Sequence, residues 1–304
     1  MIYTLGESLM DIIFDDHSNI AAKAGGAMLN LAVSLGRCGL SVSLISELGD
    51  DKIAEQITSF VNKNNVNTSN IRNYKNQTTS IALAFLDENK KPTYSFHKAY
   101  PENRNLKLPT AISKNDILIF GSFYSLDKKI RSQLKQFVSI AKDKGAIIIY
   151  DPNIRQAHHL KDKETLQAVM ENIALADIVK GSDEDFENIF GKFEDGFVLN
   201  EIRKINQDAI VIFTKGEDGA TIISGDKNLC EKPEKINIVS TVGAGDNFTA
   251  GLTYFLSKAL PENRNPKHFS ENELQIMLRT ATKFSANVCQ SLDNYVSHEF
   301  ASSL

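Results

Sequence analysis

The sequence is organised around a glycine-rich stretch near its C-terminal end, STVGAGDNFTAG at positions 240–251. The small residues from Gly243 to Gly245 allow the backbone to approach a ligand closely, with its N–H groups pointing outward. An apolar helical pattern follows, and the positive end of its dipole favours an anion at this turn. Asp246 lies at the mouth of the predicted anion site, where a carboxylate is suited to take a proton from an attacking hydroxyl. Taken alone, the stretch also fits an ordinary glycine-rich loop capped by an aspartate.

The composition is that of a globular protein without a general affinity for polyanions. The chain has 304 residues, of which 42% are hydrophobic and 24% are charged, and its net charge is −4. We therefore expect no nucleic-acid partner and no membrane association. The start of the chain lacks a basic segment and carries Glu7 and Asp11, so it does not resemble a signal peptide. Three widely spaced cysteines predict free thiols and a cytoplasmic location.

From residue 117 onward, apolar strand patterns alternate with helical patterns. The predicted strands are 117–120, 146–150, 177–179 and 209–213, and the predicted helices are 128–143, 163–175, 183–190 and 195–206. This alternation predicts an α/β fold with a central, mostly parallel sheet flanked by helices. Such sheets bind ligands outside the carboxyl ends of their strands. Polar residues follow four consecutive predicted strand ends, at Ser122 and at 151–155, 182–185 and 214–219.

Two segments nearer the N-terminus have a different pattern. Residues 80–86 and 93–96 surround a polar turn, which predicts a hairpin. With residues 12–23 it can form a small sheet apart from the main body, and such sheets often act as lids. We expect a small β lid over 12–24 and 71–98, and a large domain over 1–11, 25–70 and 99–304. Exposed strand edges favour a homodimer through this lid.

A second turn of small residues lies near the N-terminus. Gly25 and Gly26 lead into a predicted helix that contains Asn30 one turn from its start. The amide of Asn30 can reach a ligand at the double glycine, although a solvated Asn is also common near helix starts. The Gly-x-Gly-x-x-Gly fingerprint after a strand does not occur, which disfavours an NAD-dependent dehydrogenase.

These residues resemble the ribokinase or PfkB-type carbohydrate kinase family, and the resemblance covers nearly the whole chain. It rests on two motifs, Gly25-Gly26-x-x-x-Asn30 and Val242-Gly243-Ala244-Gly245-Asp246. The resemblance implies a ribokinase-like fold and the transfer of the γ-phosphoryl group of ATP, with Mg²⁺, to a primary hydroxyl of a sugar. Two further motifs resemble fructokinase-like members, Gly6-Glu7-x-x-x-Asp11 and Asp151-Pro152-Asn153-x-Arg155.

The resemblance also implies a role for each motif residue. Asp246 matches the catalytic base, and the turn from Gly243 through Ala244 to Gly245 matches the anion hole. The positions that match substrate-binding residues are Asp11, Gly25, Gly26, Asn30, Asn153 and Arg155. The positions that match nucleotide-binding residues are Ser182, Thr214, Gly216, Gly219 and Gly245. Asp185 matches a residue that contacts Mg²⁺ indirectly.

Three departures from the family pattern qualify these roles. Ser240 and Val242 replace an Asp and a Thr that help to bind a monovalent cation, so we expect weak or absent activation by potassium. Asp185 replaces a Glu, which shortens its reach toward Mg²⁺ and its waters. Asn247 replaces the usual alanine, and it either tunes Asp246 or faces outward.

The leading hypothesis is an ATP-dependent sugar kinase that converts fructose to fructose 6-phosphate. A 2-keto-3-deoxygluconate kinase is the alternative within the same class, because a few hydrogen bonds decide the choice of sugar. A non-catalytic sugar- or nucleotide-binding protein of the same fold is the alternative outside it. The intact Asp246 and its anion hole argue against that last alternative, since binding alone does not require a base.

Overall fold

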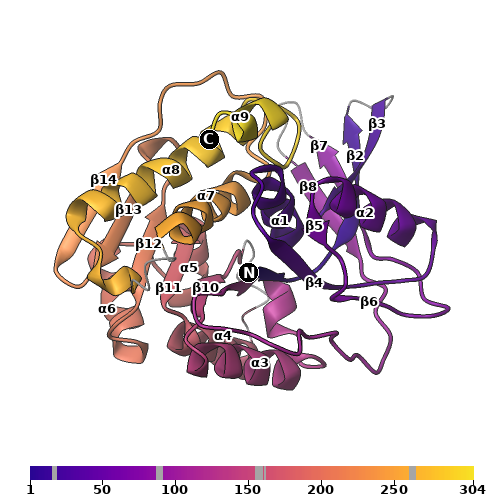
Figure 1. Cartoon of the computed structure of the whole chain (residues 1–304), viewed down its shortest axis with the longest axis horizontal. Coiled ribbons are helices and arrows are strands. Elements are labelled where there is room, and N and C mark those ends of the chain that lie inside the picture. Colours follow the sequence, from indigo (N-terminus) through magenta and orange to yellow (C-terminus); the bar gives the residue numbers. More distant parts are fainter. Residues whose placement is uncertain (16–18, 87–91, 155–159, 161, 260–264) are drawn as a thin grey trace.

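The fold combines one large sheet, two layers of helices and a smaller separate sheet (Figure 1). The computed structural model describes residues 1–15, 19–86, 92–154, 160, 162–259 and 265–304. Ten of the described strands form the large sheet, in the order β14-β13-β12-β11-β10-β9-β1-β4-β5 with β6 beside β4. The predicted α/β architecture, with a mostly parallel sheet and a smaller second sheet, is confirmed.

The strands of the large sheet run parallel except at one edge, where β13 is antiparallel to both of its neighbours. Its members are β1 (Ile2–Leu5), β4 (Val42–Leu48), β5 (Val66–Asn67), β6 (Ile71–Asn73), β9 (Ile117–Gly121), β10 (Ile147–Asp151), β11 (Ile178–Ser182), β12 (Ile210–Thr214), β13 (Ala220–Ser224) and β14 (Lys227–Glu231). The hairpin of β13 and β14 lies outside the predicted strands. The side chains of β14 are alternately half-buried and exposed, so this edge strand lacks the apolar run that marks the central ones.

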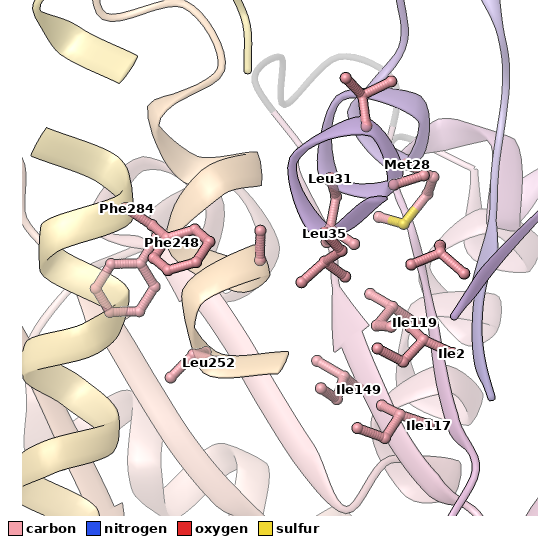
Figure 2. Close-up of a cluster of buried hydrophobic side chains, with 14 of the residues drawn as sticks. Ile2, Met28, Leu31, Leu35, Ile117, Ile119, Ile149, Phe248, Leu252 and Phe284 are labelled. Carbon is pink, nitrogen blue, oxygen red and sulfur yellow. The ribbon is translucent and has the colours of Figure 1, made fainter. Parts of the chain in front are cut away.

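Helices cover both faces of the large sheet. One face carries α1 (Ala27–Arg37), α2 (Lys52–Lys63), α7 (Ala244–Ala259), α8 (Glu271–Cys289) and the short α9 (His298–Ser302). The other face carries α3 (Arg131–Asp143), α4 (Lys163–Leu175), α5 (Asp183–Phe190) and α6 (Asp195–Ile205). Alternate strand residues point to opposite faces, so Ile117 and Ile119 join the first core while Leu118 and Phe120 join the second. Figure 2 shows Ile119 pointing toward Leu35 of α1.

The smaller sheet has the strand order β3-β2-β7-β8. Its members are β2 (Leu9–Asp15), β3 (Asn19–Gly25), β7 (Ile81–Leu86) and β8 (Pro92–His97). It brings residues from both predicted lid segments together, and its register sets Asp11 opposite Lys23 on one side and Ala82 on the other. Strand β6, at Ile71–Asn73, pairs with β4 in the large sheet instead. The domain boundaries given above remain a prediction.

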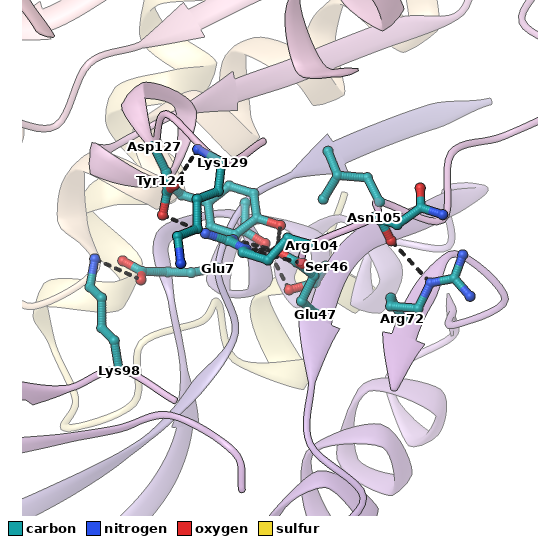
Figure 3. Close-up of polar contacts among 12 residues, drawn as sticks. Glu7, Ser46, Glu47, Arg72, Lys98, Arg104, Asn105, Tyr124, Asp127 and Lys129 are labelled. Atoms are coloured by element: carbon teal, nitrogen blue, oxygen red, sulfur yellow. Dashed lines mark hydrogen bonds and ion pairs between the residues drawn. The ribbon is translucent and has the colours of Figure 1, made fainter. Parts of the chain in front are cut away.

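A buried polar cluster fastens the loop after β8 to the large sheet (Figure 3). The side chains of Glu47 on β4 and Arg104 form an ion pair at 0% and 1% exposure. Glu47 also accepts hydrogen bonds from the hydroxyls of Tyr74 and Tyr124, and the Arg104 guanidinium lies 3.9 Å from the ring centroid of Tyr100. Because each charge has a partner, the cluster can remain buried and hold together β4 and the segments that follow β6, β8 and β9.

Two further features concern the chain as a whole. Cys38, Cys230 and Cys289 are free thiols, as the sequence predicts. Within the part of the chain that the structure describes, none of the helices combines the length and apolarity required to cross a bilayer.

Candidate active site

The two sequence motifs meet at one hydrogen bond. Asn30, in the first turn of α1, donates from Nδ2 to Oδ2 of Asp246, in the first turn of α7, at 2.9 Å. Both residues are less than one-tenth exposed. The Oδ1 atom of Asn30 is buried and has no hydrogen-bond partner among the described residues. A buried acceptor without a donor is costly, so this atom is suited to receive a hydroxyl or N–H group from a ligand.

The double glycine brings the Asp11 carboxylate next to the start of α1. A Cβ atom on Gly25 would lie 1.9 Å from Oδ2 of Asp11, so the carboxylate rests directly on the glycine backbone. Gly26 has a φ of +114°, and a Cβ atom there would lie 2.3 Å from the Glu7 carbonyl oxygen. The backbone therefore requires glycine at Gly26, and any side chain at Gly25 would displace the Asp11 carboxylate. Asp11 and the double glycine thus adjoin the helix turn that carries Asn30.

The turn before α7 presents backbone N–H groups. Gly243 has a φ of +78°, and the Ala244 N–H donates to the Thr241 carbonyl oxygen at 3.2 Å. The N–H groups of Gly245 and Asp246 have no acceptor within the described residues. As first-turn amides of a 16-residue helix, they lie at the positive end of its dipole. The amides available to an anion are therefore those of Gly245 and Asp246, whereas Ala244 closes the turn.

A buried ion pair lies beside this turn. Lys180 on β11 places its Nζ 3.0 Å from Oδ2 of Asp151, at the end of β10, and 3.4 Å from the Gly245 carbonyl oxygen. The Thr249 hydroxyl donates to the same Asp151 oxygen at 2.8 Å. Burial raises the pKa of Asp151 to about 6, although the nearby Lys180 ammonium lowers it. The pair fixes two strand ends against the first turns of α7.

Lys180 is not among the residues predicted for the site, although the sequence contains a signal for it. The predicted strand ends at Val179, whereas β11 continues through Lys180 to Ser182. A lysine within an otherwise apolar strand must find a partner when it is buried, because an unpaired charge is expensive in the interior. A predicted strand that continued through Lys180 would place this cation near the carboxyl end of the sheet, where the ligand is expected to bind.

The residues expected to bind the nucleotide lie at the neighbouring strand ends. Ser182 and Thr214 end β11 and β12 and are paired in the sheet register. Gly216 has a φ of +55°, and Gly219 has a φ of +96° with the Glu231 carbonyl oxygen 2.2 Å from where its Cβ would be. The Lys215 N–H donates to the Gly219 carbonyl oxygen at 2.8 Å, which closes this loop. The structure therefore brings these residues to one edge of the sheet, next to Asp151 and Lys180.

Three further expected residues have different surroundings. The Asp185 carboxylate accepts hydrogen bonds from the Ser182 N–H at 2.7 Å and hydroxyl at 2.8 Å, and from the Ile154 N–H at 2.5 Å. These bonds close the junction of β11 with α5. Asn153 is half-buried with a φ of +46°, in the left-handed region. Arg155 lies outside the described residues.

Known proteins resemble this chain over most of its length. The family model described as pfkB family carbohydrate kinase matches residues 1–299. The chain belongs to this family. A fructokinase of Rhizobium leguminosarum bv. trifolii is 31% identical to this pfkB family member over 261 residues, which cover 83% of this chain and 78% of that protein.

Solved structures of two kinases share the fold. A fructokinase from Vibrio cholerae O395 bound to fructose, ADP and calcium ion has a TM-score of 0.87 at 21% identity, covering 99% of this chain and 97% of that one. An aminoimidazole riboside kinase from Salmonella enterica, complexed with aminoimidazole riboside and an ATP analogue, has a TM-score of 0.83 at 18% identity over 99% and 98%. The predicted family and ribokinase-like fold are confirmed, and the protein is a phosphotransferase that acts on a sugar.

Proposed function

We propose that this pfkB kinase transfers the γ-phosphoryl group of ATP to a primary hydroxyl of fructose, giving fructose 6-phosphate. The observation that carries the proposal is the Asn30–Asp246 hydrogen bond beside the unpaired Oδ1 of Asn30. Nδ2 of Asn30 only donates, so Asp246 is held as an acceptor, which a general base must be. Oδ1 of Asn30 only accepts, so a ligand that binds there must bring a donor such as a sugar hydroxyl.

The proposed reaction uses groups from both helix starts. The sugar hydroxyl gives its proton to Asp246 while its oxygen forms a bond to the γ-phosphorus, and the bond from that phosphorus to the bridging oxygen of ADP breaks. The N–H groups of Gly245 and Asp246 would stabilise the negative charge on the transferred group. The Nζ of Lys180 lies 3.4 Å from the Gly245 carbonyl oxygen and would add a positive charge beside the transferred phosphoryl group.

Magnesium is proposed as the counterion of the ATP phosphates. Asp185 uses three of its roughly four lone-pair sites for the hydrogen bonds described above, which leaves one for a water of a bound ion. This fits the indirect contact expected from the sequence. When bound, the ion would neutralise charge on the phosphates.

Fructose suits the charge of the described site. Asp11 and Asp246 are both buried acids, which bind neutral hydroxyl groups well and repel an anion. The alternative substrate, 2-keto-3-deoxygluconate, carries a carboxylate, which these two acids would repel unless a cation such as Arg155 binds it. Similarity to the Rhizobium fructokinase supports the same choice.

A coupled assay of ADP release over a panel of fructose, ribose and 2-keto-3-deoxygluconate tests the proposal directly. We expect the highest kcat/KM with fructose, and product analysis should identify fructose 6-phosphate. Faster turnover of 2-keto-3-deoxygluconate would replace the substrate but keep the reaction. Binding of sugar and ATP without ADP release, for every sugar in the panel, would favour the non-catalytic alternative.

We also propose that the smaller sheet acts as a lid over the sugar. It carries Asp11 on β2, while Asn30 and Asp246 belong to helices that pack on the large sheet. Closure would exclude water from the transferred phosphoryl group and so suppress ATP hydrolysis.

A further inference from the structure

The side chain next to the proposed base is buried and fully engaged. Asn247 is 0% exposed, which excludes one of the two alternatives given above, that it faces outward. Its Nδ2 donates to the carbonyl oxygens of Gly243 and Asn294, both at 2.8 Å. Its Oδ1 accepts from the Ser34 hydroxyl of α1. The side chain therefore points away from solvent and joins the turn before α7 to two other parts of the chain.

The contact with Gly243 bears on the proposed anion site. The Gly243 carbonyl oxygen accepts from the backbone N–H of Asn247 at 2.9 Å as well as from its side chain. A Cβ atom on Gly243 would lie 2.9 Å from the Asn294 carbonyl oxygen, so the turn packs directly on that peptide. Holding this carbonyl fixes the first turn of α7 and the direction of the Gly245 and Asp246 N–H groups.

The segment that contains Asn294 also contacts the smaller sheet. Lys23 on β3 donates from Nζ to the Leu292 carbonyl oxygen at 2.6 Å. The Tyr295 hydroxyl donates to the carbonyl oxygen of Ala24, next to the double glycine. Residues 292–296 thus lie between the strand of the proposed lid and the turn that Asn247 holds.

We propose that Asn247 is a positioning residue for phosphoryl transfer. It acts through Gly243, keeping the α7 turn in the geometry that the transferred group requires and connecting it to the segment that β3 contacts. Asn247 itself is directed away from the space beside Asp246, toward Ser34 and Asn294. The inference rests on the proposed function, because the turn must bind the phosphoryl group for its geometry to affect the rate. Its loss should therefore lower kcat while leaving the KM for sugar nearly unchanged.

The test compares Asn247→Ala with a matched control, Asn172→Ala. Asn172 is also 0% exposed and has two side-chain hydrogen-bond partners, Arg131 and Ser125, on the opposite face of the sheet. Both variants should lower the Tm. Only Asn247→Ala should lower kcat, by about 10- to 100-fold, somewhat less than loss of a direct oxyanion donor.

Asn247→Thr tests whether the hydrogen bond to the Gly243 carbonyl oxygen, rather than those to Asn294 and Ser34, maintains kcat. A threonine hydroxyl on a helix can donate to the carbonyl four residues earlier, as Thr253 does to Thr249 at 2.8 Å in α7 itself. We expect this variant to recover part of the lost kcat. An Asn247→Ala enzyme with the control's kcat, or an Asn247→Thr enzyme no faster than the alanine variant, would overturn the proposal.

Two measurements keep the test decisive if a step fails. Hydrogen exchange of peptides covering 241–247 and 291–297 should accelerate together in Asn247→Ala and stay unchanged in Asn172→Ala, and unchanged exchange in both segments would refute the connection. This readout needs no turnover, so an inactive wild-type protein would defeat the proposed function alone.

Ser34→Ala replaces Asn247→Ala if the latter does not fold. It removes the hydroxyl that donates to Oδ1 of Asn247 and accepts the Val296 N–H at 3.1 Å. We expect it to lower kcat while leaving the KM for sugar nearly unchanged, and a wild-type kcat would contradict the inference.

Discussion

At the scale of the residue, the two carboxylates near the α7 turn have different partners and so different chemistry. Asp246 receives a hydrogen bond from a neutral amide, Asn30, whereas Asp151 is paired with the Lys180 ammonium. Because Asn30 donates to it, Asp246 faces its partner as a hydrogen-bond acceptor without forming an ion pair, which suits the proposed base. The ion pair instead assigns Asp151 to holding Lys180 in place.

Asp246→Asn tests the proposed base. The amide keeps the size of the side chain but cannot take a proton, so we expect fructose binding to survive while kcat falls by about 10²- to 10⁴-fold. ADP release gives kcat, and calorimetric titration of fructose gives the binding constant. Unchanged turnover would remove Asp246 from this role.

Asp151 should make stability depend on pH in a defined direction. Its pKa in the folded protein is about 6, above the usual 3.8, so the folded protein binds this proton more tightly than the unfolded chain does. The stabilisation that this proton binding provides is fully present below about pH 3 and is lost as the pH rises through about 6. Relative to Asp151→Asn, which does not titrate, the wild type should lose about 3 kcal/mol of unfolding free energy between about pH 3 and about pH 7. Urea unfolding at several pH values measures the difference, and a constant difference would contradict the shift.

At the scale of the element, some helix bounds follow from local signals and others do not. α4 and α5 begin where the sequence predicts, because Asp162 and Ser182 cap them through their own side chains. α3 begins at Arg131, three residues later than predicted. Asp127 accepts the Lys129 N–H there and so forms a turn before the helix.

The Glu47–Arg104 cluster should be essential for stability, because it joins β4 to the loop after β8. Glu47→Ala leaves a buried guanidinium without its main partner, so the free energy of unfolding should fall by about 3–5 kcal/mol. The control is Glu55→Ala, which removes an exposed ion pair with Lys52 and should change stability by less than about 0.5 kcal/mol. Urea denaturation measures both, and equal effects would show that the buried cluster adds nothing.

The turn at 240–246, which leads into α7, should also determine the response to potassium. The Ser240 hydroxyl accepts the Val242 N–H at 3.2 Å, and it supplies no negative charge to a cation. We expect the same kcat in potassium chloride and sodium chloride at equal ionic strength. A several-fold higher rate in potassium would show that the turn binds the cation despite these substitutions.

At the scale of the whole molecule, the smaller sheet has an apolar surface that a second copy can cover. Phe14 and Phe85 stack with ring centroids 4.9 Å apart, and Phe85 is 46% exposed. We propose that two copies pair through this sheet, which would bury these rings and protect the strand edges.

Sedimentation velocity at micromolar protein should therefore show a dimer, and Phe85→Asp should shift it to monomer by placing a charge in the apolar contact. Ile140→Asp is the matched control, because Ile140 is 45% exposed on α3, away from the smaller sheet. A wild type that sediments only as a monomer would exclude this assembly.

The sequence by itself determined the alternation of strands and helices, the smaller sheet and the two small-residue turns that precede α1 and α7. These features depend on local periodicity and on residues such as Gly26 and Gly243 that the backbone requires at single positions. The same local patterns named Asn30 and Asp246 as candidates, each from its own turn.

Only the tertiary structure decided which side chains meet. Asn30 and Asp246 are 216 residues apart, and their contact depends on α1 and α7 packing side by side on one face of the sheet. The pairing of Lys180 with Asp151 depends on the adjacency of β10 and β11, and the inward position of Asn247 depends on Ser34 and the segment that contains Asn294. Periodicity says which face of an element is apolar, but hydrogen bonds between distant residues are set by the strand order and helix packing of the complete fold.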